Sequence, residues 1–140
     1  MEIHMVLNEL SYEDILENFS LLDDWEERYR YMLDLGKLLP ALADELTTAD
    51  FLVKGCVSQV WLVPQWQDDI LKVHLDSDSH LVRGLLAVLT VIYSGKSRQE
   101  IRNISFETCF TALGLQEHLT PQRTNGVFSV VEKIKQLVMA

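Results

Sequence analysis

The chain has 140 residues, 48% of them hydrophobic, and a formal net charge of −9 at pH 7, which together predict one folded domain over residues 1–140. The acidic charge argues against a nucleic-acid-binding surface, because such surfaces carry a basic face. Residues 1–50 contain thirteen acidic and three basic side chains, so this half presents either a solvated surface or one that attracts a basic partner.

Two helices are predicted in the N-terminal half. Ser11 is the expected N-cap of the first, over residues 11–19. The second begins at Asp23–Asp24 and is broken by Pro40, and another turn is expected over residues 41–46. Apolar side chains of the second helix recur at helical spacing and are expected to share one face: Trp25, Tyr29, Met32, Leu33 and Leu39.

The middle of the chain predicts three short strands, over residues 51–54, 60–63 and 70–76. The third alternates apolar and polar residues, with Leu71, Val73 and Leu75 on one face and Lys72, His74 and Asp76 on the other. The first two are separated by Gly55–Cys56, and residues 64–69 turn the chain into the third. Because these connections are short, the strands are expected to form an antiparallel meander.

A long apolar helix follows the strands. Ser77 or Asp78 is its expected N-cap, and Gly95 ends it. Its own apolar side chains point to nearly all sides of the helix: Leu81, Val82, Leu85, Leu86, Val88, Leu89, Val91 and Ile92. It is therefore predicted to be the buried central helix.

Three further helices are expected in the last third. Ser97 starts a short one, residues 106–113 form the next before Gly114, and Thr120–Pro121 begins the last. The last helix should direct five residues inward: Val127, Val130, Val131, Ile134 and Val138. The order of helices, strands and helices indicates an α+β fold, with a small three-stranded antiparallel sheet packed with several helices.

No metal or phosphate motif is found in the sequence. The four histidines, His4, His74, His80 and His118, lack ligand spacing and are interpreted as surface or locally satisfied residues. Residues 76–78 contain two carboxylates, but a helix is expected directly after them, so helix capping is the stronger interpretation. No cofactor and no metal are therefore predicted.

Two cysteines in a chain of this size do not form a disulfide framework. The first ten residues lack the basic region and apolar core of a signal peptide and are too acidic for a transit peptide, so neither is expected. The longest apolar run, residues 85–93, is about half of what a bilayer span requires. We therefore expect a cytoplasmic, reducing location, where an exposed thiol stays reduced.

The two cysteines differ in their surroundings. Cys109 lies among apolar residues of a predicted helix and is expected to be a buried structural cysteine. Cys56 follows Gly55 at a predicted turn, where Lys54 and backbone N–H groups would lower the thiol pKa. These local features leave a reactive and a structural role for Cys56 equally open, and no neighbouring base supports a Cys/His hydrolase.

Four stretches carry motifs that extend beyond these local features: WEERYRYMLDLGKLLP at 25–40, VKGCVSQVW at 53–61, DSDSHLVRGLLAVL at 76–89 and LGLQEHLTPQRTNG at 113–126. They resemble, in the same order, the N-terminal helix, cysteine loop, central-helix junction and C-terminal entry of the SufE/CsdE family, the sulfur acceptors of cysteine desulfurases. The resemblance covers about residues 20–138 and is weakest before residue 20 and over 64–69. It implies a SufE/IscU-like fold, without separating the SufE branch from the CsdE branch.

The resemblance implies a sulfur relay. A pyridoxal-phosphate-dependent desulfurase, SufS- or CsdA-like, strips sulfur from L-cysteine and holds it as a persulfide. Cys56 matches the family cysteine that takes this sulfur, stimulates the desulfurase and passes the sulfur to a SufBCD-like iron–sulfur scaffold. The chain would then be a transfer partner and activator rather than a stand-alone enzyme, with no nucleic-acid or membrane partner. The relay needs a nucleophilic thiolate, access to a partner's sulfur and shelter from oxidants.

Asp78 and Arg123 match family positions associated with loop positioning and partner docking. For Arg123, an ordinary arginine in the first turn of a helix is an equally open interpretation, and Asp78 would also serve as a helix cap. Trp61 and Val60 are expected only to pack the sheet against a helix.

Three alternatives to the relay make different demands on the two cysteines. An iron–sulfur scaffold needs three or four converging ligands, which two cysteines do not supply. A thiol-based redox protein would need Cys109 close enough to Cys56 for a disulfide. A non-catalytic module that binds the desulfurase would keep its effect on the partner after Cys56→Ser.

Overall fold

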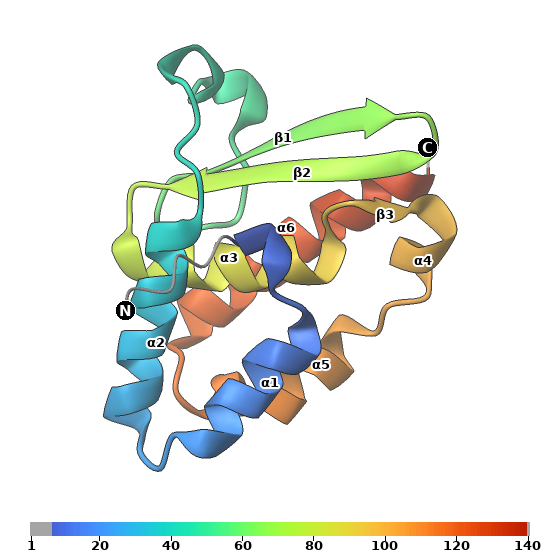
Figure 1. The fold of residues 1–140 in the computed structure, drawn as a ribbon. Coiled ribbons are helices and arrows are strands. Elements are labelled where there is room, and N and C mark those ends of the chain that lie inside the picture. Colours follow the sequence, from blue (N-terminus) through green and yellow to red (C-terminus); the bar gives the residue numbers. More distant parts are fainter. Residues whose placement is uncertain (1–6, 140) are drawn as a thin grey trace.

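The computed structural model describes residues 7–139, which form an α+β fold. A narrow antiparallel sheet lies on one side of a group of helices (Figure 1). The strands are β1 (Val60–Gln67), β2 (Ile70–Ser77) and β3 (Lys96–Ser97). The helices are α1 (Tyr12–Leu21), α2 (Trp25–Leu38), α3 (His80–Tyr93), α4 (Arg98–Arg102), α5 (Phe106–Leu113) and α6 (Pro121–Met139). No helix in the described part of the chain combines the length and apolarity needed to cross a membrane.

Helices α1 and α2 begin where local capping predicts. Ser11 Oγ accepts a bond from the Asp14 amide at 3.1 Å, and Asp14 accepts one from the Ser11 amide at 2.9 Å, which completes a capping box. Asp24 caps α2 by accepting the amide of Glu27 at 2.8 Å. The predicted starts of both helices are therefore confirmed.

The buried face of α2 differs in part from the prediction. Tyr29 is 49% exposed, whereas Met32, Leu35 and Gly36 are buried. This face is set by close packing on α3, because a Cβ built on Gly84 would lie 2.3 Å from the carbonyl oxygen of Met32. The two helix backbones meet where glycine leaves room for them, which periodicity alone does not reveal.

Helix α3 is the buried central helix, as predicted. Its buried residues are concentrated in its second and later turns: Gly84, Leu85, Leu86, Ala87, Val88, Leu89, Ile92 and Tyr93. Its N-cap, however, is neither Ser77 nor Asp78. Ser79 Oγ accepts the amide of Val82 at 3.4 Å, so Ser79 is the cap and the helix begins at His80. Ser77 instead ends β2, where it is paired with Val60.

Strands β1 and β2 form a hairpin longer than predicted. They pair in register from Val60↔Ser77 to Gln67↔Ile70, with a tight turn at Asp68–Asp69. Pro64 therefore lies inside β1 rather than in the turn. The sheet order is β1-β2-β3, so β1 is an edge strand, where a residue without an N–H group is tolerated.

The predicted strand over residues 51–54 is not formed, and the meander prediction is wrong. The segment holds a 3₁₀ turn, η3 (Ala49–Phe51), followed by one isolated bridge between Leu52 and Trp61. The third strand is β3, which pairs with Ile70 and Leu71 of β2 after α3 has crossed the sheet. A run of four residues gives too little periodicity to separate a strand from other extended backbone.

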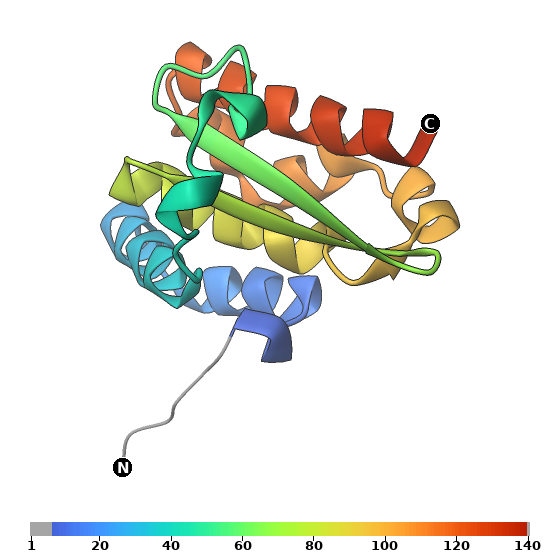
Figure 2. The ribbon, with the colours of Figure 1, turned by 90° about the horizontal axis from the view of Figure 1, so that it is seen from above.

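The C-terminal helices follow the prediction closely. Gly114, at φ 71°, ends α5, and Thr120 Oγ1 accepts the amide of Arg123 at 3.3 Å in the first turn of α6. The five residues predicted to face inward from α6 are all buried: Val127, Val130, Val131, Ile134 and Val138. Viewed from above, β1 and β2 cross over α3, with α6 on one side and α1 and α2 on the other (Figure 2).

Candidate functional site

The loop that carries Cys56 connects η3 to β1 and lies against α6. Gly55 holds φ at +93°, a conformation that L side chains rarely adopt. A Cβ at Gly55 would lie 2.6 Å from Ser129 Oγ in α6. Glycine is therefore required twice at this position, for its backbone angle and for the close approach of the loop to the helix.

The Cys56 thiol is half-buried against α6. Its Sγ donates a hydrogen bond to the carbonyl oxygen of Gly126 at 3.6 Å. Burial raises the pKa of the Cys56 thiol above its ordinary value. The expectation that Lys54 and loop N–H groups lower this pKa is wrong, because Lys54 is exposed to solvent and desolvation is the dominant effect. The free protein thus holds Cys56 as a protonated thiol.

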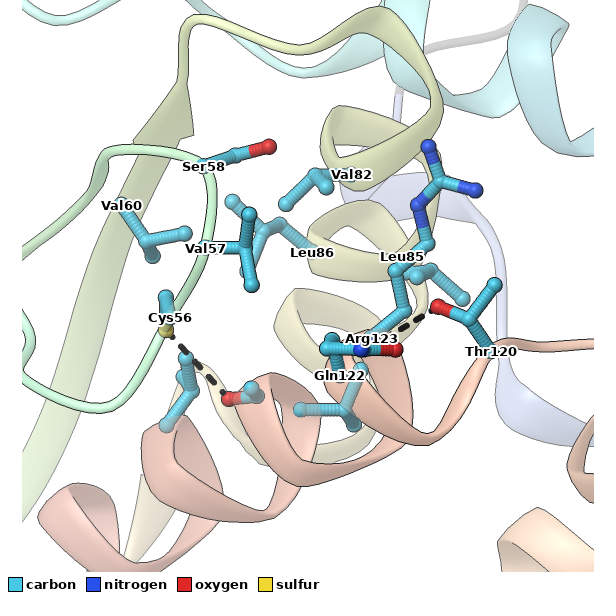
Figure 3. A pocket seen from close by; sticks show the side chains of 13 residues that line it. Cys56, Val57, Ser58, Val60, Val82, Leu85, Leu86, Thr120, Gln122 and Arg123 are labelled. Carbon is cyan, nitrogen blue, oxygen red and sulfur yellow. Dashed lines mark hydrogen bonds between the residues drawn. The ribbon is translucent and has the colours of Figure 1, made fainter.

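Cys56 opens onto a cavity of about 410 Å³ (Figure 3). Apolar side chains from the loop, β1, α3 and α6 line most of it: Val57, Val60, Val82, Leu85, Leu86, Val127 and Val130. Val57, which follows Cys56 and also lines the cavity, is 79% exposed. One face of the loop is therefore sheltered, while its tip is accessible to a partner.

Arg123 lines the same cavity from the first turn of α6. In Figure 3, its guanidinium and the Cys56 thiol lie on opposite sides of the cavity. Among residues 7–139, no hydrogen bond or ion pair engages this guanidinium, and the residue is exposed. It is thus both a first-turn helix arginine and the cation of this site.

Asp78 contacts the end of the cysteine loop. Its Oδ1 accepts the Gln59 amide at 3.1 Å, and its own amide donates to the Gln59 carbonyl oxygen at 3.4 Å. The backbone bond follows directly on the last β1–β2 pair, Val60↔Ser77, and the carboxylate bond adds to it. Asp78 therefore holds the loop where it enters β1, and the expected capping role belongs to Ser79.

A buried ion pair involves Asp76, two residues before Asp78 in the chain, and it was not predicted from the sequence. Asp76 is 7% exposed and pairs with Arg83 of α3, whose guanidinium also bonds the Leu39 carbonyl oxygen. The second carboxylate oxygen of Asp76 accepts the Leu42 amide at 2.9 Å. The prediction that Asp76 lies on a polar face of its strand is wrong, because the segment after α2 covers this carboxylate. An arginine in an otherwise apolar helix was the available signal.

Cys109 lines a different and larger cavity, of about 980 Å³, and is half-buried rather than fully buried. Tyr12 Oη donates to the carbonyl oxygen of Cys109 at 2.8 Å, which joins α1 to α5. Both cysteines are free and line separate cavities. The geometry therefore gives no support to a disulfide between them.

The three histidines within residues 7–139 form no common site. His74 bonds Gln65 at 2.8 Å, His118 packs on Trp25, and His80 is exposed at the start of α3. His4 lies outside the described residues. Over residues 7–139, no group of three or more histidine, cysteine or carboxylate side chains is arranged to hold a metal ion.

The fold and the site define a class of protein: an α+β domain with a half-buried thiol on a loop beside an apolar cavity. The SufE family profile, described as an Fe-S metabolism associated domain, matches residues 13–138. The chain belongs to the SufE family.

Individual relatives agree with this assignment. Uncharacterized SufE-like proteins of Rhizobium etli and Rhizobium meliloti are 45% and 43% identical to this chain. The alignments cover 90% and 89% of this chain, and 88% and 92% of the two relatives. The solution structure of a hypothetical protein from Thermus thermophilus has a TM-score of 0.74 at 18% identity and covers 96% of both chains. That last similarity concerns the fold alone.

Proposed function

We propose that the chain is a sulfur acceptor. Cys56 takes the terminal sulfur of a persulfide on a pyridoxal-phosphate-dependent cysteine desulfurase, stimulates that enzyme by clearing its product, and relays the sulfur to iron–sulfur cluster assembly. The whole chain, residues 1–140, acts as one such domain in the cytoplasm. The observation that carries the proposal is the Cys56 thiol, held between the Gly126 carbonyl oxygen and an apolar cavity.

The transfer is a thiolate exchange with no net oxidation. Cys56 loses its proton, and the thiolate attacks the terminal sulfur of the desulfurase persulfide. A new S–S bond forms on Cys56, the original S–S bond breaks, and the desulfurase cysteine leaves as a thiolate. The apolar lining supports the next stage, because it limits the contact of the new persulfide with water and polar oxidants.

In this proposal, Cys56 is activated in the complex with the desulfurase, and its burial against α6 and the raised pKa of its thiol support this step. A buried, protonated thiol is a poor nucleophile, since the thiolate is the reactive form. The free protein is thereby protected from unwanted reactions, and docking must change the surroundings of Cys56. In this proposal, Asp78 holds the end of the loop and Arg123 contributes to the docking surface.

The direct test is to mix the protein with a cysteine desulfurase and L-cysteine without reductant, and to weigh its peptides. We expect the mass of one sulfur atom to be added to the Cys56 peptide, to persist in Cys109→Ser, and to be absent from Cys56→Ser. Stimulation of the desulfurase should also be lost in Cys56→Ser. Sulfur gained only at Cys109, or at neither cysteine, would refute the proposal.

A second measurement tests the movement of the loop. If Cys56 leaves its place against α6 to meet the desulfurase, the amides of residues 55–59 should change their hydrogen exchange on complex formation. The amides inside α3 serve as the internal reference, because that helix is buried. Unchanged exchange over the loop would mean that the thiol reacts without leaving its shelter.

A further inference from the structure

The cavity beside Cys56 is much larger than the sulfur atom that it would shelter. A water molecule occupies about 30 Å³, and one sulfur atom is of similar size. The cavity measures about 410 Å³, which falls inside the roughly 300–1,000 Å³ range of small-molecule sites. A persulfide on Cys56 therefore leaves room for a second small molecule in the same cavity.

The charges of the lining indicate which molecule fits. Apart from Cys56 itself, Arg123 is the one ionisable side chain among the lining residues. The other polar members, Ser58, Thr120 and Gln122, are neutral, and no carboxylate from the described residues 7–139 lines the cavity. An apolar interior with one cation at the far side suits a compact ligand with an apolar body and one negative charge.

Resting on the proposed function, we infer that this cavity admits a low-molecular-weight thiol bearing a carboxylate, which takes the sulfur directly from Cys56. The carboxylate binds Arg123, the short carbon chain lies on the apolar lining, and the thiol meets the Cys56 persulfide on the opposite side. The protein then delivers sulfur to a small acceptor without a second protein.

The step is balanced. The acceptor thiolate attacks the outer sulfur of the Cys56 persulfide, a new S–S bond forms on the acceptor, and the S–S bond to Cys56 breaks. The acceptor leaves as an organic persulfide, and Cys56 leaves as a thiolate that takes a proton from solvent. No oxidant or reductant is consumed.

The first test does not need the persulfide, so it is independent of the proposed function. In Cys109→Ser, Cys56 is the remaining thiol, and its rate of mixed-disulfide formation is measured by mass with two probes of similar size. Dithiodipropionate carries a carboxylate on each half, and cystamine carries an ammonium group on each half. At a thiol without a nearby cation, the net charge of −9 should make the reaction with the cationic cystamine the faster one.

We expect the opposite order at Cys56, with dithiodipropionate faster by about threefold to fivefold, as suits one partly exposed ion pair. Arg123→Gln should abolish this preference, and Arg123→Lys should keep part of it. The matched control is Arg30→Gln on α2, whose side chain is exposed and pairs with Glu26. Circular dichroism confirms that each variant is folded.

The second test uses Cys56 loaded with sulfur by the desulfurase. Mercaptopropionate should remove that sulfur faster than cysteamine at equal thiolate concentration, and Arg123→Gln should level the two rates. If Cys56 never gains sulfur, the proposed function fails, while the disulfide probes still report on the cavity. If cystamine reacts as fast as dithiodipropionate, or Arg123→Gln slows both probes equally, the inference about the small acceptor is overturned.

Discussion

The carbonyl oxygen of Gly126 accepts the hydrogen bond of the Cys56 thiol across 3.6 Å, and Gly126 has no side chain to cover that thiol. A Cβ built at Gly126 would lie 3.5 Å from the sulfur, which is an ordinary van der Waals distance. The helix backbone therefore lies against the sulfur and still leaves room for a methyl group.

Gly126→Ala should close the shelter further without unfolding the protein. Alanine is favoured over glycine inside a helix by about 1 kcal/mol, so the free energy of unfolding should rise by up to that amount. The added methyl group touches the sulfur, so alkylation of Cys56 by iodoacetamide should slow severalfold. Mass spectrometry in the Cys109→Ser background measures the rate. Gln136→Ala, at a position of the same helix far from the cavity lining, should leave the rate unchanged.

Gly55→Ala should act in the opposite direction. An alanine at φ +93° is strained by about 1–3 kcal/mol, and its Cβ would collide with Ser129 Oγ. The loop should leave α6, so that Cys56 is alkylated faster and urea unfolds the protein more easily. Adding Ser129→Ala removes the Oγ collision but not the backbone strain, so only part of the loss should return. Full recovery in the double variant would show that the backbone angle carries no strain.

Local signals made the helices and the cysteine loop predictable from the sequence. Ser11 and Asp24 cap their helices through bonds spanning three residues, and Gly114 ends α5 with its positive φ. Each of these contacts joins residues only a few positions apart, so the capping residue or glycine that makes it can be recognised in the sequence. Four motif stretches, one of them around Cys56, likewise indicated the family, and the order of the predicted helices and strands indicated the α+β fold.

Long-range contacts explain what the sequence did not reveal. Strand β3 has two residues, Lys96 and Ser97, and exists only because α3 returns the chain to β2. The pairing of Asp76 with Arg83 depends on the segment after α2 covering them both. The predicted direction of the Cys56 pKa shift is wrong for the same reason, since the burial comes from α6, which is distant in sequence.

The buried pair of Asp76 and Arg83 should be important for stability. Arg83→Met leaves a buried carboxylate without its cation, which costs about 3–5 kcal/mol of the free energy of unfolding. Combining it with Asp76→Leu should cost less than the sum of the single changes, because the second removes the unpaired charge. Urea unfolding of the four proteins gives the coupling. The exposed pair of Glu26 and Arg30 is the control, and breaking it should cost less than about 1 kcal/mol.

The same pair should also affect the cysteine loop, because Asp78 stands two residues from Asp76 and bonds Gln59. If Arg83→Met loosens this junction, the Gln59 amide should exchange faster than in the parent protein under conditions where both remain folded. If the exchange rate of the Gln59 amide is unchanged while the protein loses stability, the pair of Asp76 and Arg83 stabilises the fold without affecting the cysteine loop.

The reactivity of Cys56 should depend on pH in a direction fixed by its burial. Because folding raises the pKa of this thiol above the ordinary value of 9.0, alkylation in Cys109→Ser should reach its midpoint at a higher pH in the folded protein than in urea. Linkage gives the sign for stability. As pH rises, the unfolded chain loses the Cys56 proton first. The contribution of Cys56 to the free energy of unfolding is therefore present below the ordinary pKa and is lost as pH rises through the raised pKa.

Adding Cys56→Ser to the Cys109→Ser parent should remove the part of the alkaline loss of stability that Cys56 causes. Urea unfolding of both proteins at a series of pH values measures this difference. Equal midpoints in the folded and unfolded chains would contradict the shift. The desulfurase supplies the final comparison. If docking moves Cys56 out of its cavity, the alkylation midpoint of a complex with a desulfurase lacking its own reactive cysteine should fall toward the ordinary value, since the desolvation that raised the pKa is relieved. A midpoint that stays high in the complex would mean that sulfur transfer occurs with the loop still against α6.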